Sequence, residues 1–130
     1  MTWERVWTVN EYYDGPIFGV ADYRGIPHVY DREWDANSDE YGPHFRLAKI
    51  DPDLLALVLE DWEIWLRWQT AIIKKRVDID THPALPEERA RHEAIRAEIG
   101  NRFDALKDGP IEATGTFRGR DGNRQVCWRA

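Results

Sequence analysis

Residues 53–76 constrain the fold most, because a helix formed there would be apolar around most of its circumference. Asp51 can cap this helix, and the cations at 74–76 suit the negative end of its dipole. At about 100° per residue, the apolar side chains form a central stripe with two flanks and leave only a narrow polar strip. Such a helix must be covered on two sides. We expect a sheet to cover one side, and a second helix or a second subunit of a homodimer to cover the other.

The flank of this helix that carries Leu57, Ile64 and Trp68 decides whether this prediction holds. If these side chains faced water in a single molecule, the helix would not belong to a packed core. Asp61 lies within the same apolar arc, where a carboxylate is costly unless it is paired. We expect a structural partner for it, since a buried Asp61 with a raised pKa would instead be a candidate site residue. Its candidate partners are Arg5, Arg46 and the indole N–H groups.

The segments on either side of this helix have the short alternating pattern of β-strands. The clearest hairpin turns are Arg24-Gly25 and Asp121-Gly122. Residues 31–40 hold too many acidic and turn-forming residues for a strand, so we expect a loop there and a strand over 45–50. Pro27 cannot donate a ladder hydrogen bond, so its strand is expected to lie at an edge or to have its donor side free.

A second helix is expected from Pro86 to about Asp108. Gly100 weakens its middle and could break it, but a single apolar stripe continues through that position. Its expected side-chain pairs are Glu87 with Arg91, Arg89 with Glu93, and His92 with Glu88. The order β-β-β-β-α-α-β-β predicts an α+β fold. We expect a mostly antiparallel sheet or partly closed barrel of about six strands, with a helical hairpin packed on one face. Nothing marks a linker, so residues 1–130 are expected to form a single domain.

Composition argues against several classes of protein. The 24 acidic and 18 basic residues give a net charge of −6, which disfavours binding to nucleic acid. Cys127 is the only cysteine, which fits a reducing compartment and excludes an intramolecular disulfide. No apolar run reaches the roughly 20 residues that span a bilayer, and residues 1–7 do not have the pattern of a secretory signal. We expect a cytoplasmic protein without a membrane anchor, cofactor or metal.

Histidines near carboxylates give the candidate catalytic arrangement. His28 lies on a predicted strand with Asp22, Asp31 and Glu33 nearby, and His44 begins the strand after the acidic loop. A histidine and a carboxylate can form a general base if both reach one cleft within hydrogen-bond distance. Structural histidines are the alternative, and the chain has neither a nucleophile elbow nor a phosphate-binding glycine loop.

Two acidic segments suggest metal ligands, but their spacing argues against a site. Residues 35–46 begin like a calcium loop, but Glu40 and Arg46 occupy the positions of the turn glycine and the closing glutamate. Residues 78–82 alternate three potential ligands along a connector, and no second cluster accompanies them. We expect a solvated loop and an inter-helix connector.

Aromatic residues are unusually frequent, with seven Trp, five Tyr and four Phe. Most are expected in the core, and those left exposed would anchor a partner. The candidate binding residues are Trp34, Trp68, Tyr30, Arg120 and Arg124.

The last predicted hairpin combines four arginines with Phe117 and Trp128. This combination is compatible with stacking on single-stranded nucleic acid. In an acidic protein, however, arginines more often meet the protein's own carboxylates or a protein partner.

One further feature is the run from Tyr13 to Pro16, followed by GVADYRGIPHVY at 19–30 and by Trp62-Glu63-Ile64-Trp65. Over roughly the first half of the chain, this pattern resembles a set of uncharacterised small bacterial proteins. The resemblance implies a bacterial, soluble, stand-alone domain and carries no activity, cofactor or catalytic residue.

The sequence therefore favours a non-enzymatic binding or interaction module that uses a Trp/Tyr-rich surface, with a protein partner or self-association as a homodimer. An acidic partner that neutralises a basic protein is one form of this. The alternative is a small hydrolase or ligand-binding enzyme that uses His28 and His44 with a carboxylate.

Overall fold

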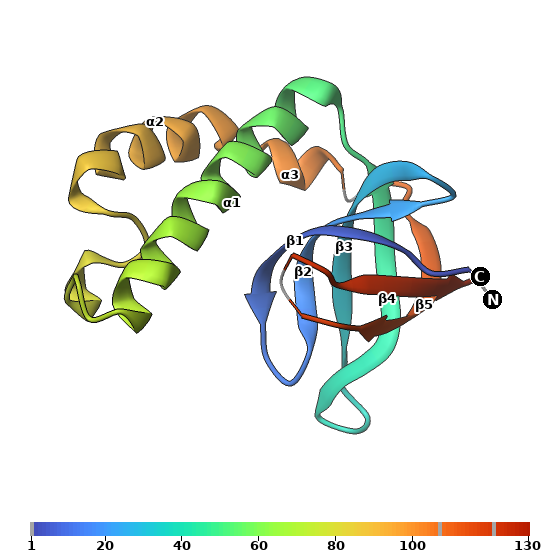
Figure 1. Cartoon of the computed structure of the whole chain (residues 1–130). Helices are drawn as coiled ribbons and strands as arrows, with labels where there is room; N and C mark the ends of the chain where they lie inside the picture. Colours follow the sequence, from blue (N-terminus) through green and yellow to red (C-terminus); the bar gives the residue numbers. More distant parts are fainter. Residues whose placement is uncertain (1, 107, 121) are drawn as a thin grey trace. The chain divides into compact units, whose positions relative to one another are not determined.

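The computed structural model describes residues 2–106, 108–120 and 122–130. The chain divides into two compact units. One combines the residues up to Ile50 with those from Asp104 onward, and the other is Asp51–Phe103. The strands belong to the first unit and the long helix to the second (Figure 1). The single domain stays a prediction, as does the packing of the helices on the sheet.

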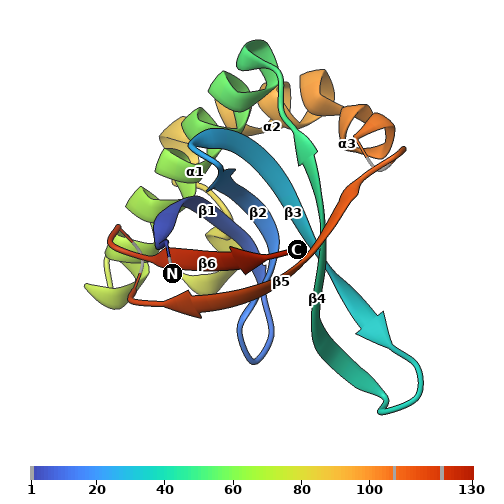
Figure 2. The same cartoon turned by 90° about the vertical axis from the view of Figure 1, so that its right-hand side faces the viewer.

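In the described part of the chain, six antiparallel strands close into a barrel in sequence order. They are β1 (Glu4–Tyr12), β2 (Pro16–Tyr23), β3 (Ile26–Asp35), β4 (Glu40–Lys49), β5 (Ile111–Arg118) and β6 (Gln125–Arg129) (Figure 2). β6 closes the barrel against β1 through the pairs Glu4↔Val126 and Arg5↔Gln125. The predicted α+β class and six-stranded antiparallel barrel are confirmed.

The hairpin turns agree in part with the predictions. Arg24 and Gly25 both have positive φ, 53° and 77°, as a two-residue hairpin turn requires. Asp121 of the other predicted turn lies outside the described residues, but the Asn123 N–H donates to the Arg120 carbonyl across that reversal. The edge position considered for the strand of Pro27 is wrong, because β3 pairs with both β2 and β4.

The β3–β4 hairpin is longer than predicted, which corrects the loop expected over 31–40. β3 continues to Asp35, β4 begins at Glu40, and only the residues between them form the turn. Cross-strand contacts explain the extension: Arg46 Nη2 lies 2.9 Å from the Asp31 carboxylate, and Trp34 packs edge-to-face on Tyr41 at 5.0 Å. These pairs stabilise a strand whose composition alone favours a turn.

The barrel core is aromatic, and two glycines make room for it. Tyr30 has no exposed surface, packs against Phe45 and Trp128, and donates from its hydroxyl to the Thr8 carbonyl at 2.8 Å. A Cβ at Gly19 would lie 2.6 Å from the Tyr30 hydroxyl and 2.2 Å from the Thr8 carbonyl oxygen. A Cβ at Gly115 would lie 2.5 Å from the Trp128 ring. Any larger side chain at either position would displace the core.

The helix α1 (Pro52–Ile73) begins as predicted, with the Asp51 carboxylate accepting from the Leu54 N–H at 3.0 Å. It ends at Ile73 rather than at residue 76. Leu57 is half-buried, and Ile64 and Trp68 are 1% and 5% exposed, so the apolar flank does not face water. The prediction that this flank does not face water is confirmed. No described helix is both long and apolar enough to cross a membrane.

The second predicted helix is interrupted, which corrects the expectation that it continues through Gly100. The structure has a 3₁₀ turn, η2 (Pro86–Glu88), followed by α2 (Arg89–Ile99) and α3 (Arg102–Ala105). Gly100 adopts φ 49°, and its N–H donates to the Arg96 carbonyl, so it ends α2. Ile95 and Ile99 are buried as the stripe predicted. The apolar stripe therefore predicts which residues are buried, but it does not predict that the helix is unbroken.

Candidate functional site

β4 and β5 separate toward the end of the barrel that carries the β1–β2, β3–β4 and β5–β6 turns. Their pairing extends from Leu47↔Ile111 only to His44↔Thr114. Beyond that point β4 stays paired with β3, and β5 stays paired with β6. Figure 2 shows that the β3–β4 hairpin extends away from β5. The wall of the barrel is therefore open here between β4 and β5.

A pocket of about 350 Å³ lies at this opening. Its lining residues come from β1, β2, β3, β4, β5 and the turns: Tyr12, Gly15, Pro16, Arg32, Phe45, Gly115, Thr116, Phe117, Arg118, Gly119 and Arg124. Three of them are arginines, and none of the described lining residues is acidic. In a protein with a net charge of −6, this is a local concentration of positive charge. Guanidinium groups recognise carboxylates and phosphates through paired N–H donors, so the pocket suits an anionic group.

Arg32 and Arg118 are held by neutral acceptors. Arg32 Nε donates to the Gly42 carbonyl at 2.6 Å, and Arg118 Nε donates to Gln125 Oε1 at 3.0 Å. Among the residues that the structure describes, neither arginine forms an ion pair, and their Nη atoms make no hydrogen bond. These bonds therefore orient both side chains while their charges remain uncompensated by a contacting carboxylate.

Each arginine of the pocket also lies over an aromatic ring. The guanidinium carbons of Arg32, Arg118 and Arg124 lie 5.7, 3.9 and 5.7 Å from the ring centroids of Phe45, Trp3 and Tyr12. At these distances the electron-rich faces of the rings attract the cationic groups. These cation–π contacts help to hold the guanidinium groups at the pocket.

The candidate histidine site is not assembled. His28 is 3% exposed, and its Nδ1–H donates to the Ile26 carbonyl at 2.7 Å. Lys49 lies opposite His28 on β4, so His44 is about 17 Å further along that strand at ~3.4 Å per residue. His44 is also exposed, and it alternates with the inward-facing Phe45.

The carboxylates of the same candidate site have other partners. Asp22 accepts from the Trp7 indole N–H at 2.7 Å. Asp31 and Glu33 lie 2.9 and 3.7 Å from the Arg46 guanidinium. The structure thus brings neither two histidines nor a histidine and a carboxylate of this set into one cleft. The alternative catalytic hypothesis therefore has no assembled general base to support it.

The aromatic candidates lie in three different environments. Trp34 is 52% exposed and forms a surface pair with Tyr41. Tyr30 lies wholly inside the barrel core. Trp68 is buried in the helical unit, where its indole N–H donates to Thr81 Oγ1 at 2.8 Å. Of the three, Trp34 alone is placed where it could contact a partner without unfolding.

The arginine candidates of the last hairpin separate in a similar way. Arg124 lines the pocket, whereas Arg120 is exposed and does not. Phe117 and Trp128 pack against the barrel core, so they do not form an exposed stacking platform with these arginines. The contact of Arg118 with Trp3 was not anticipated, because it joins residues near opposite ends of the chain.

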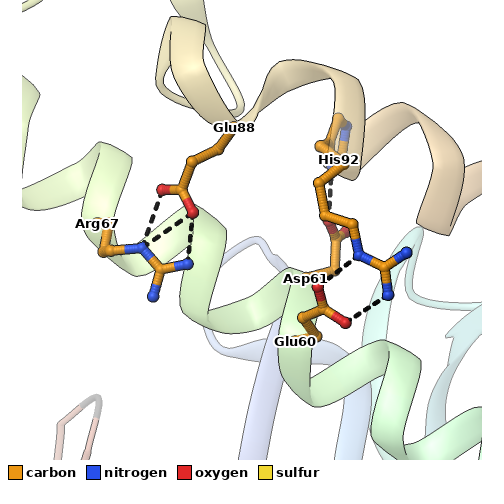
Figure 3. A network of polar contacts seen from close by, with 6 residues as sticks. Glu60, Asp61, Arg67, Glu88 and His92 are labelled. Atoms are coloured by element: carbon orange, nitrogen blue, oxygen red, sulfur yellow. Dashed lines mark hydrogen bonds and ion pairs between the residues drawn. The ribbon is translucent and has the colours of Figure 1, made fainter.

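The helical unit uses its charges differently (Figure 3). Arg67 Nε donates to the Glu88 carboxylate at 2.9 Å, and Arg91 Nη2 donates to Glu60 at 2.6 Å. These hydrogen bonds lower the pKa of the Glu88 and Glu60 carboxyl groups. The expected partner of Arg91, Glu87, is corrected to Glu60.

Asp61 and His92 form the third pair of this network. His92 Nδ1–H donates to Asp61 Oδ1 at 2.6 Å, and the two side chains are only 12% and 16% exposed (Figure 3). The partner expected for His92 was Glu88, and Arg5, Arg46 or an indole was expected for Asp61, so both assignments are corrected. The predicted pair Arg89–Glu93 is present at 3.9 Å.

The acidic segments serve local structure. The Asp35 carboxylate accepts from the Asn37 and Ser38 N–H groups at 2.9 and 3.4 Å, and the Asn37 bond is the main cause of its lowered pKa. In the connector, His82 packs edge-on against Trp68. Among residues 2–106, 108–120 and 122–130, no three His, Cys, Asp or Glu side chains are grouped to hold a metal ion.

A second pocket, of about 650 Å³, lies within the helical unit. Its lining is mostly apolar and includes Leu66, Val77 and Leu85. Arg67 also lines it but is bonded to Glu88. Arg76 and Glu87 line it as well, so this pocket has a carboxylate beside its arginines and is less suited to an anion than the barrel pocket.

The chain matches no known family model, no curated protein sequence and no solved structure. The assignment of a site therefore depends on geometry, and the barrel pocket with its three arginines is the strongest candidate.

Proposed function

We propose that this protein is a non-enzymatic binding module, that the open end of its barrel is the binding site, and that its ligand carries negative charge. The supporting observation is the pocket that Arg32 and Arg118 line, since neither of these guanidinium groups forms an ion pair within the described chain. A few directed polar groups in a concave, partly aromatic site are typical of ligand recognition. The neighbouring Tyr12 and Tyr13, which are 63% and 70% exposed, add aromatic surface of the kind that anchors partners.

The partner we propose is another molecule rather than a second copy of this chain. The homodimer was expected because the helix 53–76 needed cover, but its critical flank is buried or half-buried within one chain. We propose that this partner is a protein and that the two meet in the cytoplasm.

An anion titration followed by NMR tests this function. Sodium phosphate added at constant ionic strength should shift the amide signals of Gly15 and Gly119 and the side-chain Nε–H signals of Arg32 and Arg118. The R32Q variant should lose these shifts, whereas R129Q should keep them, because Arg129 is exposed outside the pocket. Shifts that are absent, or that are spread evenly over all exposed arginines, would contradict a built anion site.

A further inference from the structure

We infer that the open end of the barrel binds an extended acidic peptide segment of a partner protein, which adds as a strand to the free edge of β5. This inference rests on the proposed function and names the class of ligand. It draws on three features: an unpaired strand edge, the charge beside it, and the alternation of the side chains along it.

The edge is a continuous stretch of backbone. In the described chain, Gly115–Arg118 pair with β6 on one side, but the β4 ladder stops at Thr114 on the other. Alternate residues of an antiparallel strand direct their N–H and C=O groups to opposite sides. Part of the backbone of this stretch is therefore available to a new strand. The same stretch, together with Gly119, lines the pocket, so the edge and the anion site are one place.

The charge beside the edge selects the partner. Arg32 and Arg118 are held by neutral oxygen atoms, and the described pocket lining has no carboxylate. A peptide that supplied only backbone hydrogen bonds would leave these guanidinium groups without counter-charges. Acidic side chains at the inward positions of the added strand would form charge-assisted hydrogen bonds with Arg32, while Arg118 adds positive charge to the site.

The side chains of β5 predict the pattern of the peptide. Phe117 points toward the barrel core, whereas Thr116 and Arg118 are exposed on the opposite face. Because side chains alternate along a strand, an added peptide would present one set of residues inward, where Arg32 lies over Phe45, and the other set outward. Backbone pairing then gives affinity and the alternate side chains give specificity, as in other cases of strand addition. We expect acidic residues at the inward positions, facing Arg32, alternating with apolar ones.

A second copy of this chain fits the edge less well. Antiparallel pairing of two β5 edges would bring the arginines of both copies, Arg118 and Arg120, to one interface. Like charges across paired strands are unfavourable, and charged edge residues prevent self-association in natural sheets. The acidic β3–β4 turn of another copy could still occupy the site. The experiment below distinguishes this self-association from binding of a separate partner.

The experiment uses the full chain and a blocked five-residue peptide that alternates aspartate and valine. Binding is followed by NMR shifts and by amide hydrogen exchange. We expect slowed exchange within Gly115–Gly119 and binding that R32Q weakens about tenfold. The matched control R129Q should bind like the wild type. A peptide of the same length that alternates lysine and valine should bind neither the wild type nor R129Q.

Two N-methylated forms of the acidic peptide separate strand addition from simple anion capture. One is methylated at the valine amides and the other at the aspartate amides. Because alternate amides face the edge, strand addition requires one form to lose about tenfold in affinity while the other retains it. Equal affinity of both forms would overturn the strand model and leave the proposed anion site intact.

Two further outcomes are informative. If neither the peptide nor phosphate binds, both the inference and the proposed function fail. If sedimentation shows that the protein alone is an oligomer, and R32Q makes it monomeric, then a second copy occupies the site and the inferred partner is wrong. A wild-type monomer supports a separate partner. Circular dichroism of R32Q confirms that the variant is folded.

Discussion

Arginines of the helical unit and arginines of the barrel pocket have different partners. Arg67 and Arg91 each bind a glutamate carboxylate, so their charges are locally compensated. Arg32 and Arg118 instead donate to a backbone carbonyl and a glutamine amide oxygen, and they lie over aromatic rings. A compensated arginine contributes to structure, whereas an oriented but uncompensated one is ready for an anionic ligand. The two regions should therefore respond differently to substitution.

The largest expected effect is on stability and concerns Gly115, which lines the pocket and packs against the barrel core. Gly115→Val should destabilise the protein by about 3 kcal/mol, because a Cβ there meets the Trp128 ring at 2.5 Å. Urea unfolding measures the loss. Gly42→Ala is the control, since its Cβ would meet only an ordinary contact of 3.6 Å. A stable Gly115→Val would mean that the barrel end is looser than the structure indicates.

The half-buried pair of the helical unit comes next. Asp61→Ala should cost about 2 kcal/mol of stability, because it leaves His92 without its acceptor. A double-mutant cycle with His92→Ala should show coupling, and phosphate binding should not change. The exposed Glu63 on the same helix provides the control, with little loss expected for Glu63→Ala. Additive effects of Asp61→Ala and His92→Ala would show that the pair contributes no interaction energy.

The same substitution, arginine to glutamine, made in each of the two regions sharpens the comparison. Arg32→Gln should weaken anion binding strongly but cost only about 1 kcal/mol of stability, the value of its hydrogen bond to Gly42. Arg67→Gln should lower stability and leave anion binding unchanged. Thermal unfolding and the phosphate titration, run on both variants, measure the two quantities. Equal loss of binding in both would mean that the effect is general charge rather than a site.

The smallest effect is the acid sensitivity of the helical unit. The pKa of the Glu88 carboxyl is lowered by its hydrogen bonds from Arg67, relative to an ordinary value of 4.5. The unfolded chain therefore takes up this proton first as the pH falls. The stabilisation is present above pH 4.5 and is lost as the pH falls through the lowered pKa. Solvent screening limits it to about 0.5 kcal/mol.

Glu88→Gln should reduce the slope of stability against pH in this acidic range, and urea unfolding at several pH values would show it. The exposed Glu87 serves as the comparison, because no described contact joins it to Arg67. If Glu88→Gln and Glu87→Gln changed the slope equally, the ion pair would not be its cause.

Much of the fold followed from local spacing. The apolar periodicity and the cap at Asp51 predicted α1, and the turn at Arg24-Gly25 predicted the β2–β3 hairpin. The interruption at Gly100 and the length of the β3–β4 hairpin did not follow. The interruption depends on a C-cap at which Gly100 has positive φ, and the apolar stripe continues past it. The length of the hairpin depends on cross-strand pairs such as Trp34–Tyr41.

The candidate site was predictable only in part. Arg124 was identified, but Arg32 lies between Asp31 and Glu33, and in sequence it looks compensated. Strand alternation holds the signal that could have found it, since neighbours along a strand point to opposite faces. Arg118 shows the same limit, because its contact with Trp3 depends on the closure of the barrel.

The sequence by itself determined the elements: where the chain alternates, where it is helical, and how many strands an antiparallel barrel could use. Those features depend on the backbone geometry of residues a few positions apart. The tertiary structure decided which charges meet, placing Asp61 with His92 and leaving Arg32 and Arg118 beside an open strand edge. Such pairings depend on register and closure between distant segments, and no local period encodes them.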